Sequence, residues 1–186
     1  MFSLKRPSTA ELAALVGDAD AMGNLSYSEV GATSGDLPAG YRHDRWQTDL
    51  GPDHGDRFDR AVTALRHWQP QRGAGLRVFP DSRVRLDDTF VLVIRLGLVY
   101  ATAGGRVVYV NDEPDQYRFA YGTLTSHPEQ GEESFAVERT GGRVNFAITA
   151  FSRLRHPLAR AGAPVTRQLQ LRATRLYLQA MRDVTR

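Results

Sequence analysis

Residues 84–151 constrain the fold most, because they form a long series of strand-like segments with turn signals between them. β-branched and aromatic residues, which pack well on a pleated surface, fill the segments 107–110, 117–124, 134–139 and 144–151. The turn signals are Gly104-Gly105, Pro114-Asp115, the HPEQG run at 127–131 and Gly141-Gly142. Connections this short join neighbouring antiparallel strands. The sequence therefore predicts an antiparallel meander.

One face of this sheet is predicted to be apolar. Side chains alternate between the two faces of a strand, which places together Phe119 and Tyr121, Phe135 and Val137, and Val144, Phe146 and Ile148. The last segment of the chain offers a cover for that face. It has Pro164 in its first turn and apolar residues at helical spacing, namely Val165, Leu169, Ala173, Leu176, Ala180 and Val184. We predict that a long C-terminal helix crosses the sheet.

Shorter elements are predicted before the meander. Ser8 and Glu11 form a capping box for a short helix that ends at Gly17. Segments 26–32 and 41–50 read as strands. A second helix is indicated by apolar residues at helical spacing, which are Phe58, Ala61, Val62, Leu65 and Trp68. The predicted fold class is α+β: a curved antiparallel sheet wrapped around a long C-terminal helix, with shorter N-terminal helices, in one domain spanning residues 1–186.

Composition narrows the class of protein. The chain has 186 residues, of which 41% are hydrophobic and 24% charged, as in a globular protein long enough for one core. It has no cysteine, which excludes disulfides and cysteine-based zinc sites. Its 24 basic and 21 acidic residues leave a net charge of +3, a weak field that does not favour nucleic-acid binding. No transmembrane segment or secretory signal is visible, and a cytoplasmic location is expected.

The stretch 119–135 holds the residues best suited to chemistry. His127 stands near Glu129, Glu132 and Glu133, and an imidazole beside carboxylates can act as a general base or bind a divalent metal. The alternative, which we favour, is that His127 shapes a hairpin connection while the glutamates are solvated or cap backbone N–H groups. A single histidine without the spacing of a zinc motif does not indicate zinc, and no metal site is predicted.

Strand alternation separates two of these glutamates. Glu132 and Glu133 are adjacent, so they point to opposite faces and cannot act as a carboxylate pair on one substrate. Glu133 shares a face with Phe135, which makes it the better candidate for a pocket. A buried glutamate needs a partner or a raised pKa. The possible cationic partners are Arg118, Arg139 and Arg143.

Several segments resemble an uncharacterised family known as domain of unknown function nineteen-ninety. They are Leu50-Gly51, the helix carrying Phe58 and Trp68, and residues 106–110, 119–124, 127–129, 131–133 and 150–153. The resemblance covers most of the chain after about Tyr27; Thr125-Ser126 departs from it where members often carry Pro-Gly, and Leu154 where proline is common. The family is similar to the START-like or Bet v 1-like helix-grip superfamily, whose members hold lipids, sterols or polyketides between sheet and helix. The resemblance implies a similar pocket here, and no cofactor is expected.

The predicted architecture itself favours a ligand cavity. One helix face does not fill all the space within a curved sheet, and the cavity that remains is suited to a small hydrophobic or amphiphilic molecule. The predicted ligand-binding residues are Tyr109, Phe119, Tyr121, His127, Glu133 and Phe146. Tyrosine suits the wall of such a pocket because it joins an apolar ring to a polar tip. Ordinary packing within the sheet is the alternative, and commoner, role for these tyrosines.

Three functions remain open from the sequence. The leading hypothesis is binding of a small hydrophobic or amphiphilic ligand. The second is an enzyme of the cyclase or hydrolase kind that uses His127 or Glu133 as acid or base in the same cavity. The third is a protein-interaction module, in which the arginines on the exposed face of the last helix, such as Arg172, meet an acidic partner.

Overall fold

The computed structural model describes residues 2–127, 129–154 and 163–186. Its strands form one antiparallel sheet with the order β2-β8-β7-β6-β5-β4-β3, and β1 pairs with β5. The strands are β1 (Phe2–Ser3), β2 (Arg42–Pro52), β3 (Arg77–Phe79), β4 (Thr89–Leu96), β5 (Val99–Glu113), β6 (Gln116–Thr123), β7 (Glu129–Thr140) and β8 (Arg143–Leu154). The helices are α1 (Thr9–Met22), α2 (Arg57–Arg66), α3 (Gln69–Gly73) and α5 (Ala163–Val184), with a short 3-10 turn η1 (Ala32–Ser34).

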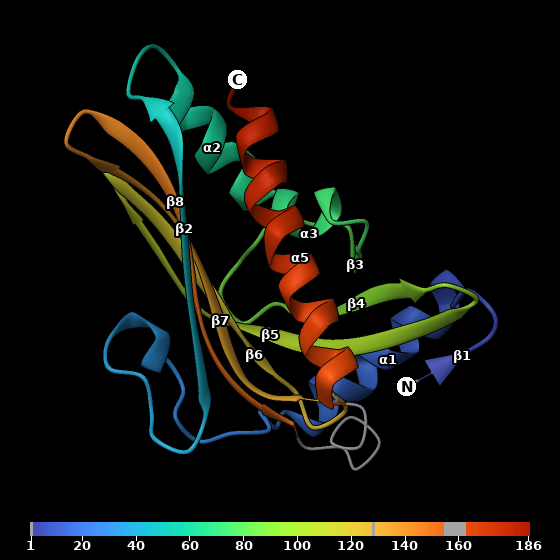
Figure 1. Cartoon of the computed structure of the whole chain (residues 1–186). Coiled ribbons are helices and arrows are strands. Elements are labelled where there is room, and N and C mark those ends of the chain that lie inside the picture. Colours follow the sequence, from blue (N-terminus) through green and yellow to red (C-terminus); the bar gives the residue numbers. More distant parts are fainter. Residues whose placement is uncertain (1, 128, 155–162) are drawn as a thin grey trace.

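Helices lie on both sides of the curved sheet (Figure 1). The helix α5 runs across its inner face, with α2 and α3 packed beside it. The loop that carries η1 lies on the outer face, against β7 and β8. This α+β arrangement, a curved sheet gripping a long C-terminal helix, confirms the predicted fold class.

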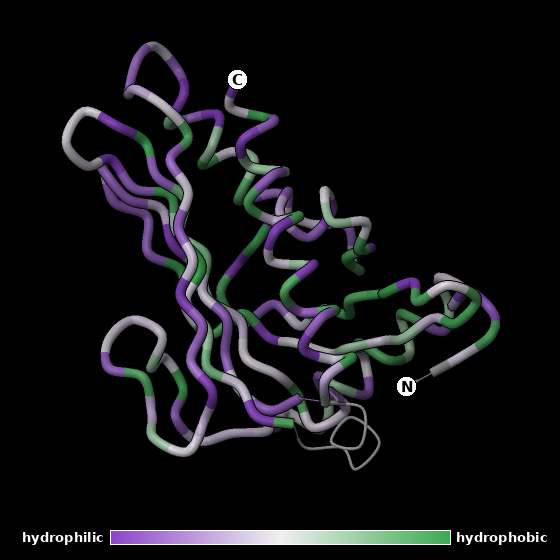
Figure 2. Tube along the Cα trace, viewed as in Figure 1, coloured by the Kyte–Doolittle hydropathy of each residue, from purple (hydrophilic) through white to green (hydrophobic). Residues whose placement is uncertain are grey.

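The main core lies between the inner face of the sheet and α2, α3 and α5. Alternation places Phe119, Phe135 and Phe146 on this face, and each is fully buried. The rings of Phe119 and Phe135 are stacked with 5.4 Å between their centroids, and Trp68 meets Phe119 edge-on at a centroid distance of 5.2 Å. Hydrophobic and hydrophilic residues accordingly alternate along α5 and the strands in Figure 2. A smaller cluster, in which Leu12 of α1 packs on β4, covers part of the opposite face.

Both predicted N-terminal helices, α1 and α2, are present, and α1 is longer than predicted. Ser8 caps α1, its hydroxyl accepts the backbone N–H of Glu11, and the Glu11 carboxylate accepts the Ser8 N–H. The helix continues through Gly17 and ends at Gly23, whose backbone is left-handed. The helix α2 buries the predicted apolar face, including Phe58 and Leu65.

The prediction that 26–32 forms a strand is wrong. Only an isolated bridge pairs Leu25 with Leu124, and the residues that follow form bends and the turn η1. An extended-looking segment becomes a strand only where a neighbouring strand satisfies its backbone. Here the N–H groups of Gly31 and Thr33 are satisfied by the side chain of Glu132 instead.

The predicted apolar stripe of the last helix, α5, is buried towards its C-terminal end and exposed near its N-terminal end. Ala173 packs against the core and Ala180 is buried, as expected, but Val165 is 66% exposed and Leu169 is 41% exposed. The fully packed part lies further along, where Tyr177 and Met181 are buried. The first half of α5 therefore stands away from the packed core.

The predicted turn at Gly104-Gly105 is also wrong, because both glycines lie inside β5 and the turn is at Gly97. Gly105 pairs with Phe90, and a Cβ added there would lie 2.5 Å from the Phe90 ring. The turns at Pro114-Asp115 and Gly141-Gly142 do connect neighbouring strands. The glycines of β5 therefore serve close packing.

Substituting Gly105 with valine is expected to lower the free energy of unfolding by about 1–3 kcal/mol, because the Phe90 ring must leave its packed position. Urea denaturation measures the change. The matched control is Gly17→Ala in α1, where an added Cβ meets nothing within 4 Å. Alanine is the better helix former, so this control is expected to stabilise by up to about 1 kcal/mol. Equal effects of the two substitutions would contradict the packing role of Gly105.

Candidate functional site

A cavity of about 380 Å³ lies between the inner face of the sheet and the first half of α5. Its volume falls within the range of roughly 300–1,000 Å³ that is usual for small-molecule sites. Most of its wall is apolar and is made of Trp46, Leu76, Leu92, Ile94, Leu96, Ala101, Ala103, Ile148, Ala150, Leu169 and Ala173. Alanine at four of these positions leaves room that larger side chains would fill. The cavity therefore exists because small side chains line this part of the sheet and of α5.

A carboxyl group lies within this wall. Tyr121 and Glu133 are directly opposite each other on β6 and β7, and the Tyr121 hydroxyl donates a hydrogen bond to the Glu133 carboxylate at 2.5 Å. Burial raises the pKa of Glu133 to about 7, although the hydrogen bond from Tyr121 acts in the opposite direction. The Glu133 carboxyl can therefore be neutral or ionised near neutral pH.

Two tyrosine hydroxyls accompany this carboxyl. Burial raises the pKa of Tyr121 and of Tyr177 well above the ordinary value, and the charge of Glu133 adds to the effect on both. The Tyr177 ring meets Phe135 edge-on, with 5.8 Å between the ring centroids. Both phenols are consequently neutral and can donate hydrogen bonds.

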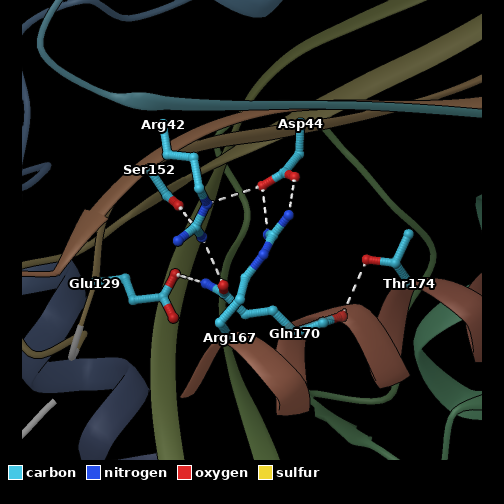
Figure 3. A network of polar contacts seen from close by, with 7 residues as sticks. All are labelled: Arg42, Asp44, Glu129, Ser152, Arg167, Gln170 and Thr174. Atoms are coloured by element: carbon cyan, nitrogen blue, oxygen red, sulfur yellow. Dashed lines mark hydrogen bonds and ion pairs between the residues drawn. The ribbon is translucent and has the colours of Figure 1, made fainter. Parts of the chain in front are cut away.

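The rim of the cavity is a polar network that joins β2 to α5 (Figure 3). Arg167 of α5 binds Asp44 of β2 through two hydrogen bonds, at 2.8 and 2.6 Å. Arg42 donates to Asp44 from its Nε at 3.2 Å. Burial pushes the pKa of Asp44 upward, but the two arginines outweigh it and the pKa is lowered. Asp44 is therefore an anion held between two cations.

Gln170 extends this network to β7. Its side-chain oxygen accepts a hydrogen bond from Arg42 at 2.5 Å, and its nitrogen donates to Glu129 at 2.7 Å (Figure 3). Burial raises the pKa of Glu129, and the bond from Gln170 acts against that rise. Among the described residues, this network holds two arginines and two carboxylates, so its formal charges balance.

His127 lies at the same end of the cavity and has a structural contact. Its ring Nδ1 lies 3.0 Å from the backbone nitrogen of Glu129 and 3.2 Å from the carbonyl oxygen of the same residue. Burial lowers the pKa of His127 to about 4. The imidazole is therefore uncharged at neutral pH.

The structure brings three of the six predicted ligand-binding residues to the cavity wall: Tyr121, His127 and Glu133. Phe119 and Phe146 lie in the packed aromatic core behind the wall. Tyr109 forms a hydrogen bond with Thr33 on the outer face, because the register of β5 against β6 shifts between Val107 and Tyr109. A bulge of this kind reverses the side-chain alternation that follows it.

The predicted cationic partners of Glu133 are wrong. The three arginines instead pair with surface carboxylates: Arg118 with Glu138, Arg139 with Asp53 and Asp115, and Arg143 with Asp49. The structure also confirms that Glu132 and Glu133 point apart, since Glu132 binds the loop on the outer face.

Sequence reasoning missed Asp44, Arg167, Gln170 and Tyr177. Side-chain alternation along β2 places Asp44 on the same face as Trp46, so the sequence could have predicted that these two residues share a face. Its pairing with Arg167 spans 123 positions, and no local pattern predicts it. Tyr177 follows Ala173 at helical spacing and could have been assigned to the apolar stripe.

Within the described residues, no group of three or more histidine, aspartate or glutamate side chains is placed to hold a metal ion. None of the described helices is both long and apolar enough to span a membrane.

Solved structures resemble this fold at low sequence identity. A hypothetical protein from Helicobacter pylori has a TM-score of 0.59 and 12% identity, and the match covers 88% of this chain and 96% of that one. The di-domain ARO/CYC StfQ from the steffimycin biosynthetic pathway has a TM-score of 0.51 and 11% identity, over 77% of this chain and 50% of that one. These likenesses concern the fold alone.

Proteins related in sequence show higher identity to this chain. A UPF0548 protein from Deinococcus radiodurans is 35% identical over 195 residues, which cover 97% of each protein. A UPF0548 protein from Arabidopsis thaliana is 28% identical over 61% of this chain and 58% of its own length. The profile of the domain of unknown function DUF1990 matches residues 26–180, which include the strands β2 to β8 and most of α5. The chain belongs to the DUF1990 family.

Proposed function

We propose that this protein binds a small hydrophobic or amphiphilic molecule in the cavity between the sheet and α5. The observation that carries the proposal is the cavity itself: about 380 Å³ with a mostly apolar wall, a polar rim and the carboxyl group of Glu133 in the wall. Such a space stays open only at a cost in packing, because filling it would stabilise the fold. An apolar ligand would recover that energy on binding.

Filling the cavity is expected to abolish ligand binding without unfolding the protein. Ala150→Phe places a ring in the wall of the cavity, and binding of the uncharged dye Nile red is expected to weaken by at least about tenfold. Fluorescence titration measures the affinity. The matched control is Ala147→Phe on the same strand, whose side chain points to the opposite face.

Equal Nile red affinity in the wild type and in Ala150→Phe would contradict the assignment of the site. Native mass spectrometry of protein purified without detergent, followed by organic extraction, tests for a natural ligand. An adduct that the wild type carries and Ala150→Phe lacks would support the proposal. Absence of both dye binding and any adduct would overturn it.

A catalytic use of the same cavity is the second candidate. It is favoured by the position of Glu133 in the cavity wall beside the Tyr121 hydroxyl, where burial raises the pKa of Glu133 to about 7, in the range suited to general acid–base catalysis. His127 is the weaker candidate, because an imidazole with a pKa of about 4 is a poor base. Incubating the extracted ligand with the wild type and with Glu133→Gln distinguishes the two functions: a change in ligand mass that only the wild type produces indicates catalysis.

A further inference from the structure

The charges around Glu133 restrict the ligand that the cavity can accept, given the binding function proposed above. In the part of the chain that the structure describes, no lysine or arginine contacts the Glu133 carboxylate, whose hydrogen bond comes from Tyr121. The charged groups that act on it are Glu129 and Asp44, and both are acidic. Among the described residues, the interior of the cavity therefore holds no counter-ion for Glu133.

The arginines of the rim are already paired with other side chains. Among the described residues, Arg167 is the arginine in the cavity wall, and both of its terminal nitrogens bind Asp44. Arg42, its neighbour, binds Asp44, Ser152 and Gln170. A carboxylate or phosphate entering the cavity would have to break these pairs, which are bidentate or shared and costly to separate.

A free hydroxyl faces the same space. Tyr177 is part of the cavity wall, and within the described residues its hydroxyl has no hydrogen-bond partner. A phenol can both donate and accept, so it can pair with a ligand hydroxyl or accept from an amine. Tyr177 on α5 and Glu133 on β7 thus offer two contacts for one polar head group.

We propose that the cavity selects amphiphiles whose head group donates a hydrogen bond to Glu133 and carries no negative charge, such as long-chain alcohols and amines, in preference to fatty acids of the same length. A hydroxyl or ammonium donor stabilises the carboxylate through a charge-assisted bond. When Glu133 is ionised, a ligand carboxylate would instead meet a like charge in a poorly solvated space, where no cation of the described residues compensates it.

Competition among dodecanol, dodecylamine and dodecanoate for the Nile red site tests this selection, because the three share one chain length. In the wild type, the alcohol and the amine are expected to displace the dye at concentrations at least about tenfold lower than dodecanoate. In Glu133→Gln, the amine is expected to lose about tenfold in affinity and dodecanoate to lose nothing. The matched control is Glu138→Gln, on the same strand but paired with Arg118 outside the cavity, and it is expected to keep the wild-type order.

A second variant guards against a folding defect in Glu133→Gln. Tyr177→Phe keeps the ring and removes the free hydroxyl, and it is expected to weaken dodecanol binding several-fold with less effect on Nile red. Dodecanoate binding the wild type as well as dodecanol does would overturn the head-group selection and leave ligand binding itself intact. Failure of all three competitors and of the dye would overturn the binding function, and the selection with it.

Discussion

Replacing Glu132 with glutamine is expected to lower the free energy of unfolding by about 3 kcal/mol. The Glu132 carboxylate is almost fully buried on the outer face of β7. It accepts hydrogen bonds from the Tyr27 hydroxyl at 2.6 Å and from the Gly31 N–H at 2.7 Å. The Thr33 N–H and hydroxyl also donate to it, at 3.0 and 2.5 Å. Glutamine keeps the shape but turns an NH₂ donor toward these donors, so buried groups lose their partner.

Chemical denaturation at neutral pH measures this loss. The control is Glu138→Gln, which removes a carboxylate from the same strand. The partner of Glu138, Arg118, is partly exposed, so this substitution is expected to cost at most about 1 kcal/mol. Limited proteolysis supplies a second readout, because the loop 25–35 is held to the sheet by Glu132 and is expected to become the first site of cleavage. Equal stability of the two variants would show that Glu132 does not hold the loop.

Local sequence signals predict the regular elements of this fold well. The helix α5, the helix α2 and the strands β6 to β8 follow from apolar periodicity, which each segment carries by itself. The turns at Pro114-Asp115 and Gly141-Gly142 are correct for the same reason, since their chemistry is local. The turn predicted at Gly104-Gly105 was wrong because glycine also allows close packing within a strand. The ring that packs against Gly105 belongs to Phe90, which is distant in the sequence.

The candidate site is only partly readable from the sequence. Alternation predicted that Glu133 would face the helix while Glu132 faced away, because strand parity needs no knowledge of the partner strands. The same rule failed at Tyr109, where a bulge shifts the register. The rim pair of Asp44 and Arg167 depends on how α5 lies across β2, which no local pattern specifies. Pairings across long sequence separations therefore account for most of what was missed.

Opposite pH dependences are expected from the two titratable groups at the cavity, Glu133 and His127. Burial raises the pKa of Glu133 from 4.5 to about 7, so the unfolded chain releases this proton first and stability falls as pH rises through that interval. Burial lowers the pKa of His127 from 6.5 to about 4, so the unfolded chain binds this proton first and stability falls as pH drops through that interval. Each difference corresponds to about 3 kcal/mol.

The two effects overlap between about pH 4.5 and pH 6.5 and offset each other in the wild type, so single variants are needed to separate them. Relative to the wild type, Glu133→Gln is expected to gain about 3 kcal/mol as pH rises from 4.5 to 7, because it removes a carboxylate that is costly to ionise. His127→Gln is expected to change in the opposite direction, losing about 3 kcal/mol relative to the wild type as pH rises from 4 to 6.5. Urea denaturation at constant ionic strength across this range measures both slopes. Stability curves of the two cavity variants that run parallel to that of the wild type would mean that neither group is desolvated, and the cavity would then be open to bulk water rather than shaped for an apolar ligand.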